Sequence, residues 1–261
     1  MNYKNNHSID MEPGAGARYL ETLGISDIDS FIYKPKPTDY ESPWLMPHMK
    51  EAVQAYHNCM EKGYAVFVQV DPDVDGFTSA SEIINFTYEK FPNAELTYRL
   101  QDGKEHGLIY DKIPKKAQLI IVPDAGTNQE DIVKQLSEEG KTVIILDHHE
   151  FECRYNYNNV YVVNCQDNYC GNHCLSGAGV VYKFMQGYDE MYGGRDSYKK
   201  YQDLAALGIL ADAMDSRTLD NNAIIRNGLC NICNPMLKAL IKHLGTLKVK
   251  NPNKPTKTNI A

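Results

Sequence analysis

The sequence AVFVQVDPDVDG at residues 65–76 decides the fold class, because an apolar run ends there in three aspartates and a glycine. Residues 65–70 are β-branched, aromatic or small except for Gln69 and lack helical periodicity, which predicts a buried strand. Residues 77–90 carry apolar side chains at helical spacing. A strand that runs through an acidic turn into a helix indicates the first part of a strand–helix–strand unit.

Four more segments predict strands, at residues 94–100, 118–123, 142–146 and 160–163. Helices are predicted at residues 18–23, 49–62, 77–90 and 128–139, and the chain is mainly helical from Gly177 onward, at residues 179–186, 198–214, 221–231 and 235–244. Strands that alternate with such helices imply right-handed crossovers. The predicted class is therefore α/β, with a parallel sheet of about five strands flanked by helices and a helical C-terminal part.

Length and composition agree with one large domain that has small appendages. The chain has 261 residues, of which 43% are hydrophobic and 23% charged, as in globular proteins. We expect an N-terminal arm at residues 1–45, the main domain at 46–245, and a basic flexible tail or linker at 246–261. The lysines near this end suit a solvated tail, with a nucleic-acid contact as the alternative.

Charge and cysteine content exclude several classes of protein. The net charge of −7 argues against a general polyanion-binding surface. A nuclease whose acidic residues lie in its metal site remains compatible with this charge. No apolar run has the length of a membrane span, and Met1–Asp10 lacks the apolar core of a signal peptide. Seven cysteines, an odd number, suit reduced thiols, so we expect a cytoplasmic protein without membrane contact.

The cysteines leave a structural zinc site as a minor alternative. One cluster contains Cys165, Cys170, His173 and Cys174, and Cys230 and Cys233 have the spacing of a zinc knuckle. The first cluster is irregular and the second lies in a predicted helix. Reduced free thiols are the preferred interpretation.

Acidic residues and histidines follow the apolar runs at their carboxyl ends, where an open parallel sheet collects its functional groups. They are Asp71, Asp73 and Asp75 after the first strand, Asp124 after the third, Asp147, His148 and His149 after the fourth, and Asp212 after an apolar helical stretch. Carboxylates that converge in one place repel each other unless cations hold them. The arrangement predicts a site for two divalent metals.

The first acidic segment has a rival interpretation as a calcium-binding EF-hand loop. Residues 71–76 together with Glu82 match the pattern D-x-D-x-D-G-x5-E. An EF-hand needs a helix before the loop, whereas residues 65–70 predict a strand. We therefore expect the aspartates on a turn that leads into a helix N-terminus, with Gly76 allowing a tight backbone there.

The remaining candidates differ in strength. Two consecutive histidines after a strand point to opposite sides, so we expect His148 to bind metal and His149 to face a substrate phosphate, with Asp147 orienting an imidazole or a water. Arg99 suits bidentate binding of a phosphate, although an exposed arginine at a strand end explains it equally well. His106 either joins the site or is a loop residue. Asp124 is the expected bridging carboxylate.

These clusters, in this order, resemble the DHH phosphoesterase superfamily, which is named after the DHH motif at residues 147–149. Within it they are most similar to the RecJ single-strand-specific exonucleases, and a phage version is expected. The stretches that carry the resemblance are DPDVDGFTS at 71–79, VPDAG at 122–126, LDHHE at 146–150, LSGAGVVYK at 175–183 and ALGILAD at 206–212. The resemblance extends from about Leu23 to about Leu244.

The resemblance implies that residues 46–245 form a DHH phosphoesterase domain that hydrolyses phosphodiester bonds. The expected protein is a 5′-to-3′ exonuclease of single-stranded DNA in repair or recombination, with two divalent cations, Mn2+ rather than Mg2+. The implied metal ligands are Asp73, Asp75, Asp124, His148 and Asp212, with Asp71 as a further acidic position. The expected catalytic residues are Asp124, His148 and His149, and the expected phosphate contacts are Arg99, His106 and His149.

Two departures from the family pattern keep other functions open. Gln69 stands where many relatives carry a histidine, and the second domain of RecJ-like proteins is not visible after Leu244. Either a partner chain or a missing domain then supplies the remaining substrate-binding residues, or the substrate is smaller than a long DNA strand. The alternatives are a phosphodiesterase for short oligonucleotides or cyclic dinucleotides, and a non-catalytic module that binds nucleic acid or a replication partner.

Overall fold

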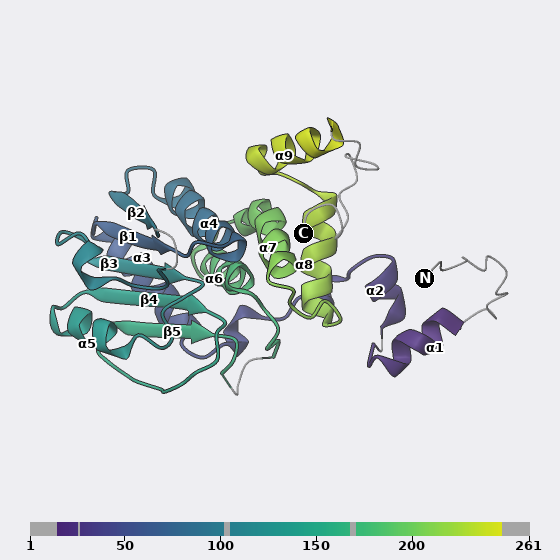
Figure 1. The fold of residues 1–261 in the computed structure, drawn as a ribbon, viewed down its shortest axis with the longest axis horizontal. Coiled ribbons are helices and arrows are strands. Elements are labelled where there is room, and N and C mark those ends of the chain that lie inside the picture. Colours follow the sequence, from purple (N-terminus) through teal and green to yellow (C-terminus); the bar gives the residue numbers. More distant parts are fainter. Residues whose placement is uncertain (1–14, 26, 102–104, 168–170, 247–261) are drawn as a thin grey trace.

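The computed structural model describes residues 15–25, 27–101, 105–167 and 171–246, and a five-stranded parallel sheet lies at its centre (Figure 1). The strands are β1 (Val66–Val70), β2 (Leu96–Leu100), β3 (Leu119–Pro123), β4 (Thr142–Asp147) and β5 (Val160–Asn164). Their order in the sheet is β2-β1-β3-β4-β5, and all neighbours are parallel. The predicted α/β class is confirmed. The winding direction reverses between β1 and β3, where such sheets bind ligands.

Helices cover both faces of the sheet. One face carries α3 (Met49–Glu61), α4 (Val74–Lys90) and α6 (Gly177–Tyr192), and the other carries α5 (Glu130–Glu138). Along β1, Val66, Val68 and Val70 pack in the core beneath α3, α4 and α6, whereas Phe67 packs in the core on the α5 side. Burial on both faces explains why β1, β3 and β4 are continuous apolar runs in the sequence.

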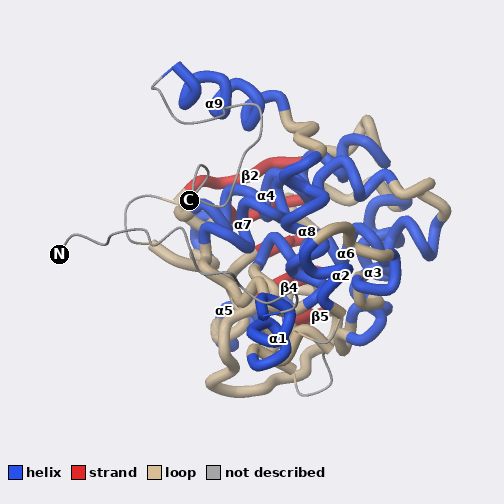
Figure 2. Tube along the Cα trace, turned by 90° about the vertical axis from the view of Figure 1, so that its right-hand side faces the viewer, coloured by secondary structure: helices blue, strands red, loops and turns tan. Residues whose placement is uncertain are grey.

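The C-terminal helices form a further layer. The helix α7 (Gln202–Ala211) packs on α4 and α6, and α8 (Leu219–Cys230) packs on α7, away from the sheet (Figure 1). In Figure 2 these helices lie in front of the strands. The remaining helices α1 (Ala15–Thr22), α2 (Ile28–Ile32) and α9 (Pro235–Thr246) lie at the α8 side of the molecule, and short 3-10 turns are at Pro37–Asp39, Pro43–Leu45, Tyr110–Lys112 and Ser197–Tyr201.

The structure corrects several predicted boundaries. The helix predicted at residues 77–90 begins three residues earlier, because the side chain of Asp73 caps it by accepting a hydrogen bond from the Gly76 N–H at 2.8 Å. The segment predicted as one helix at residues 198–214 is a 3-10 turn followed by α7. Among the described residues, the connections from β2 to β3 and from β4 to β5 contain no α-helix.

The domain boundaries proposed from the sequence stay predictions, and most of the predicted tail, residues 247–261, lies outside the described residues. Within the described ranges, no helix has both the length and the apolar character that crossing a bilayer requires.

A buried ion pair joins the N-terminal segment to the helical layer. Lys183 of α6 donates to Asp220 of α8 at 2.7 Å and to the Glu41 carbonyl at 2.8 Å, and both charged side chains are 1% exposed. Asn172 donates to the other Asp220 oxygen at 3.3 Å. Because four segments share this ion pair, it sets their relative positions.

We predict that Lys183→Met lowers the free energy of unfolding by about 3–5 kcal/mol, because it leaves Asp220 buried and unpaired. Urea unfolding followed by circular dichroism measures this loss. The control is Lys199→Met, which breaks the exposed ion pair with Asp196 and should cost at most about 1 kcal/mol. If both variants lost equally little free energy of unfolding, the buried ion pair would not stabilise the fold as we predict.

Candidate metal centre

Four of the predicted ligands meet around one imidazole nitrogen at the carboxyl edge of the sheet. His148 Nε2 lies 3.2 Å from Asp124 Oδ1, 3.7 Å from Asp212 Oδ2 and 3.9 Å from Asp75 Oδ2. His148 follows β4 and Asp124 follows β3. Asp212 comes directly after α7, and Asp75 lies in the first turn of α4. The structure therefore brings together side chains that are up to 137 residues apart in the chain, from Asp75 to Asp212.

A second acidic group adjoins the first. Ligand atoms of Asp71, Asp73 and Asp124 all lie within 4.8 Å of one another. Asp124 also belongs to a group with Asp147, His148 and His149, whose ligand atoms likewise lie within 4.8 Å of one another. Because Asp124 is shared, it occupies the place of a carboxylate that could bridge two cations.

A hydrogen bond to β4 holds Asp124 in this place despite a strained backbone. Its φ of 61° lies in the left-handed region, which is unfavourable for a residue with a Cβ, and its N–H donates to the Leu146 carbonyl at 2.9 Å. The contact with His148 lacks hydrogen-bond geometry, so the buried Oδ1 has no hydrogen-bond partner.

The electrostatics of Asp124 favour a bound cation. Burial and the nearby carboxylates of Asp75, Asp147 and Asp73 raise the pKa of Asp124 to about 11. A carboxylate under this repulsion is stabilised by a cation that its neighbours share. Carboxylate oxygens together with one imidazole nitrogen are ligands of divalent metals such as Mn2+, so the residues present fit the predicted metal.

The buried side chain of Asp75 contacts the N-terminus of α6. Its carboxylate accepts hydrogen bonds from Ser176 Oγ at 2.8 Å, from the Gly177 N–H at 2.6 Å and from the Ala178 N–H at 3.1 Å. The helix dipole and the free amides make this a favourable place for a negative charge. Burial nevertheless raises the pKa of Asp75. The charge of His148 and the hydrogen bond from Ser176 lower this pKa, but burial outweighs them.

Two glycines make room for the acidic residues. A Cβ on Gly177 would lie 2.4 Å from Asp124 Oδ1, and a Cβ on Gly208 would lie 2.2 Å from Asp75 Oδ1. Neither glycine was predicted as a site residue. Gly177 lies in the stretch LSGAG at residues 175–179, which carries the family resemblance, so a signal for it was present in the sequence.

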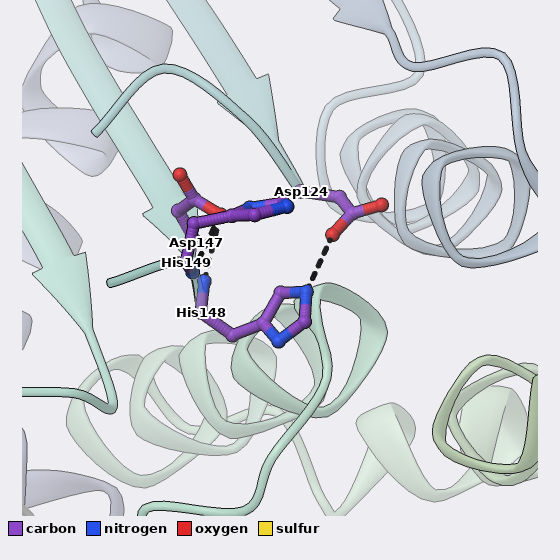
Figure 3. A group of neighbouring side chains, drawn as sticks. All are labelled: Asp124, Asp147, His148 and His149. Atoms are coloured by element: carbon purple, nitrogen blue, oxygen red, sulfur yellow. Dashed lines mark hydrogen bonds and ion pairs between the residues drawn. The ribbon is translucent and has the colours of Figure 1, made fainter. Parts of the chain in front are cut away.

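Asp147 orients His149 rather than pointing into the ligand cluster (Figure 3). Asp147 Oδ1 lies 2.7 Å from His149 Nδ1, and Oδ2 accepts the Thr127 N–H at 3.0 Å. Burial acts to raise the pKa of Asp147, but the hydrogen bond and charge of His149 and the contacts with Thr127 outweigh it and hold the pKa at about 2. The same hydrogen bond raises the pKa of His149.

A cleft of about 240 Å³ opens beside this pair. His106, whose Nδ1 lies 3.4 Å from Asp71 Oδ2, and His149 both line it. The cleft is also lined by residues that the sequence analysis missed, namely Thr127, Asn128 and Gln129. They begin three residues after Asp124, and a run of three polar residues shortly after a strand end is the signal that could have indicated them.

Other predicted residues lie differently from what the sequence suggested. Asp212 was predicted inside a helix at residues 198–214, but it follows the last residue of α7 and is exposed. Arg99 pairs with Glu105 and does not line the cleft. Among the described residues, no candidate metal-binding group contains a cysteine, and Cys170 lies outside the described residues.

The EF-hand interpretation is wrong, because the strand β1 precedes the loop where an EF-hand has a helix. Glu82 is fully buried in α4, and neither carboxyl oxygen has a hydrogen-bond partner. Burial and the negative charges of Asp75 and Asp203 raise the pKa of Glu82 well above 4.5.

We predict that Gly177→Ala weakens Mn2+ binding by about five- to a hundredfold, because the added Cβ overlaps Asp124 and such overpacking costs about 1–3 kcal/mol. Isothermal titration with Mn2+ measures the affinity. Gly16→Ala in α1 is the control, since a Cβ there has open space. Unchanged Mn2+ affinity in Gly177→Ala would separate Gly177 from the metal centre.

We predict that Glu82→Gln stabilises the protein at pH 8 and has little effect near pH 4. Because the folded-state pKa of Glu82 is raised, its contribution to stability is present below about 4.5 and is lost as the pH rises through the folded pKa. Glutamine carries no charge and avoids this loss. Urea unfolding between pH 4 and 8 tests it, with exposed Glu138→Gln as the control. A difference that does not grow with pH would refute the prediction.

The sequence comparisons agree with this geometry. YorK from the SPbeta prophage of Bacillus subtilis (strain 168), described as a single-strand DNA-specific exonuclease, is 44% identical over 228 residues, which are 87% of this chain and 39% of YorK. The single-stranded-DNA-specific exonuclease RecJ of Escherichia coli (strain K12) is 27% identical over 226 residues, 77% of this chain and 38% of RecJ. The chain thus spans about two fifths of the length of these curated relatives.

A crystal structure of exonuclease RecJ bound to manganese has the same fold. It superposes with a TM-score of 0.71 at 21% identity, over 83% of this chain and 55% of that chain. The model of the DHH family, N-terminal domain, matches residues 64–209, which include β1 to β5 and most of α7. The chain therefore belongs to the DHH family.

Proposed function

We propose that this chain hydrolyses phosphodiester bonds in single-stranded DNA, with divalent cations and in the 5′-to-3′ direction, as a RecJ-like exonuclease. The observation that carries the proposal is the sharing of Asp124 between two groups of side chains that could bind a metal ion. The naming of YorK and RecJ as exonucleases of single-stranded DNA supports the choice of substrate.

The two cations would have different ligands. His148, Asp75, Asp124 and Asp212 would hold one, and Asp71, Asp73 and Asp124 the other. The imidazole ligand favours Mn2+ over Mg2+. When bound, the cations would supply Lewis-acid activation of water and neutralise charge that develops on the phosphate.

The protein's own side chains would orient the substrate phosphate. Asp147 accepts from the Nδ1 side of His149 and favours its protonated form, so Nε2 can donate to a phosphate oxygen in the cleft. His106 borders the same cleft at Asp71. Arg99 would become a third phosphate contact only by leaving Glu105.

The small cleft keeps a second function under consideration. A volume of about 240 Å³ suits the phosphate and sugar of one nucleotide rather than a long strand. A phosphodiesterase for short oligonucleotides or cyclic dinucleotides is therefore the second candidate, and a partner chain or a further domain would supply any longer grip. A non-catalytic binding module is disfavoured, because the acidic and histidine positions of the cluster are all present.

We predict that Asp124→Ala lowers kcat by about 10³-fold, the scale of losing one principal transition-state contact, and leaves the fold intact. Release of nucleotides from 5′-labelled single-stranded DNA with Mn2+ measures kcat, and circular dichroism checks the fold. The control is Asp111→Ala, an exposed aspartate outside the cleft. Retained activity in Asp124→Ala would remove Asp124 from the centre.

Parallel assays separate the candidate substrates. Stepwise release of mononucleotides from a long single strand supports the exonuclease. Cleavage restricted to a dinucleotide or a cyclic dinucleotide supports the second candidate. No hydrolysis of any of the three by the protein with Mn2+ would overturn both.

A further inference from the structure

An uncharged apolar strip runs along the sheet edge from the candidate metal centre. We define it by five residues, namely Phe77, Ile84 and Tyr88 of α4 and Tyr98 and Leu100 of β2. Phe77 is 45% exposed, Tyr88 43%, Tyr98 58% and Leu100 54%. Exposed aromatic residues grouped in this way usually mark a binding surface.

The register of β2 explains why its two residues belong to this surface. Tyr98 pairs with Val68 and Leu100 pairs with Val70 of β1, and paired residues in a sheet point to the same face. Val68 and Val70 pack under α4. Tyr98 and Leu100 therefore point to the same face of the sheet as Val68 and Val70, which is the face with α4. Because β2 is an edge strand, they lie at the edge of this face.

The three α4 residues face this edge. Phe77, Ile84 and Tyr88 lie at positions i, i+7 and i+11 and so share one stripe of the helix. The hydroxyl of Tyr88 donates to the Leu96 carbonyl at 3.4 Å, which places the stripe next to β2. At about 1.5 Å per residue, Phe77 and Tyr88 are about 16 Å apart along the helix.

The strip begins at the metal centre. Phe77 lies one turn after Asp73, and its N–H donates to the Asp73 carbonyl at 2.9 Å. Asp73 belongs to the acidic group that contains Asp124. A nucleobase that contacts Phe77 would therefore be next to a phosphate held at this group.

The charges near the strip allow a polyanion to approach. The strip itself carries no charge, and the carboxylates near its far end, Glu89 and Glu95, pair with Lys200 and Lys116. On a protein with a net charge of −7, such a neutral path repels phosphates less than the surrounding surface does.

We propose that the strip is a stacking track for the bases of the single-stranded substrate, in which Phe77 and Tyr98 hold bases beside the cleavage position. The inference rests on the proposed function. Base–aromatic stacking is independent of sequence, and the length of about 16 Å accommodates about four or five bases at about 3.4 Å each.

The test compares a 12-nucleotide oligo(dT) with bis(p-nitrophenyl) phosphate, a single phosphodiester without further nucleotides that could lie along β2. Tyr98→Ser should raise the KM for oligo(dT) by about five- to a hundredfold, because each base–aromatic stack contributes on this scale. Its effect on hydrolysis of the small substrate should be much smaller. Phe77→Leu, which stays apolar but loses the flat ring, should act in the same direction. Tyr33→Ser, at an exposed tyrosine on the segment after α2, is the control and should match the wild type.

The outcomes separate the inference from the proposed function. If the wild-type protein with Mn2+ hydrolyses neither substrate, the proposed function fails. If the wild type is active and Tyr98→Ser and Phe77→Leu keep its KM for oligo(dT), the stacking track is wrong. Equal losses on both substrates would assign these residues a structural role. A wild-type dimer in light scattering that becomes monomeric in Tyr98→Ser would identify the strip as an interface between copies instead.

Discussion

The hydrogen bonds between the Asp75 carboxylate and the N-terminus of α6 hold the site together. Asp75 lies in the first turn of α4, so these bonds join the start of one helix to the start of another. They also place Gly177 against Asp124 at the end of β3. Because glycine has no side chain, the two carboxylates approach each other more closely than any larger residue at this position would allow.

This close approach stores electrostatic repulsion. Asp124 has a buried oxygen without a hydrogen-bond partner and a left-handed backbone, and both features are unfavourable in the absence of a ligand. A binding site that is organised before its cation arrives needs little rearrangement on binding. The free energy gained by packing the apolar cores on both faces of the sheet offsets this destabilisation. The buried ion pair of Lys183 and Asp220 keeps the surrounding segments in position.

The two sides of the centre have different chemistry. On the cleft side, His149 and His106 offer imidazole donors, with Thr127 and Asn128 beside them. On the sheet-edge side, beyond Asp73, the aromatic side chains of Phe77 and Tyr98 are exposed. A phosphate requires the first environment and a nucleobase requires the second, so one nucleotide could satisfy both at the same centre.

The sequence by itself determined the strands, most of the helices and the side chains that converge at the carboxyl ends of the strands. Apolar runs that end in aspartate or histidine are local patterns, and parallel pairing then forces their ends to one edge. Local patterns could not show that Asp73 caps α4 and moves its start to Val74, or that Asp212 is exposed. They also could not show that Arg99 pairs with Glu105 or that Glu82 is buried without a partner. The tertiary structure decided these features, because each depends on a neighbour supplied by packing or by a loop whose path the sequence pattern does not specify.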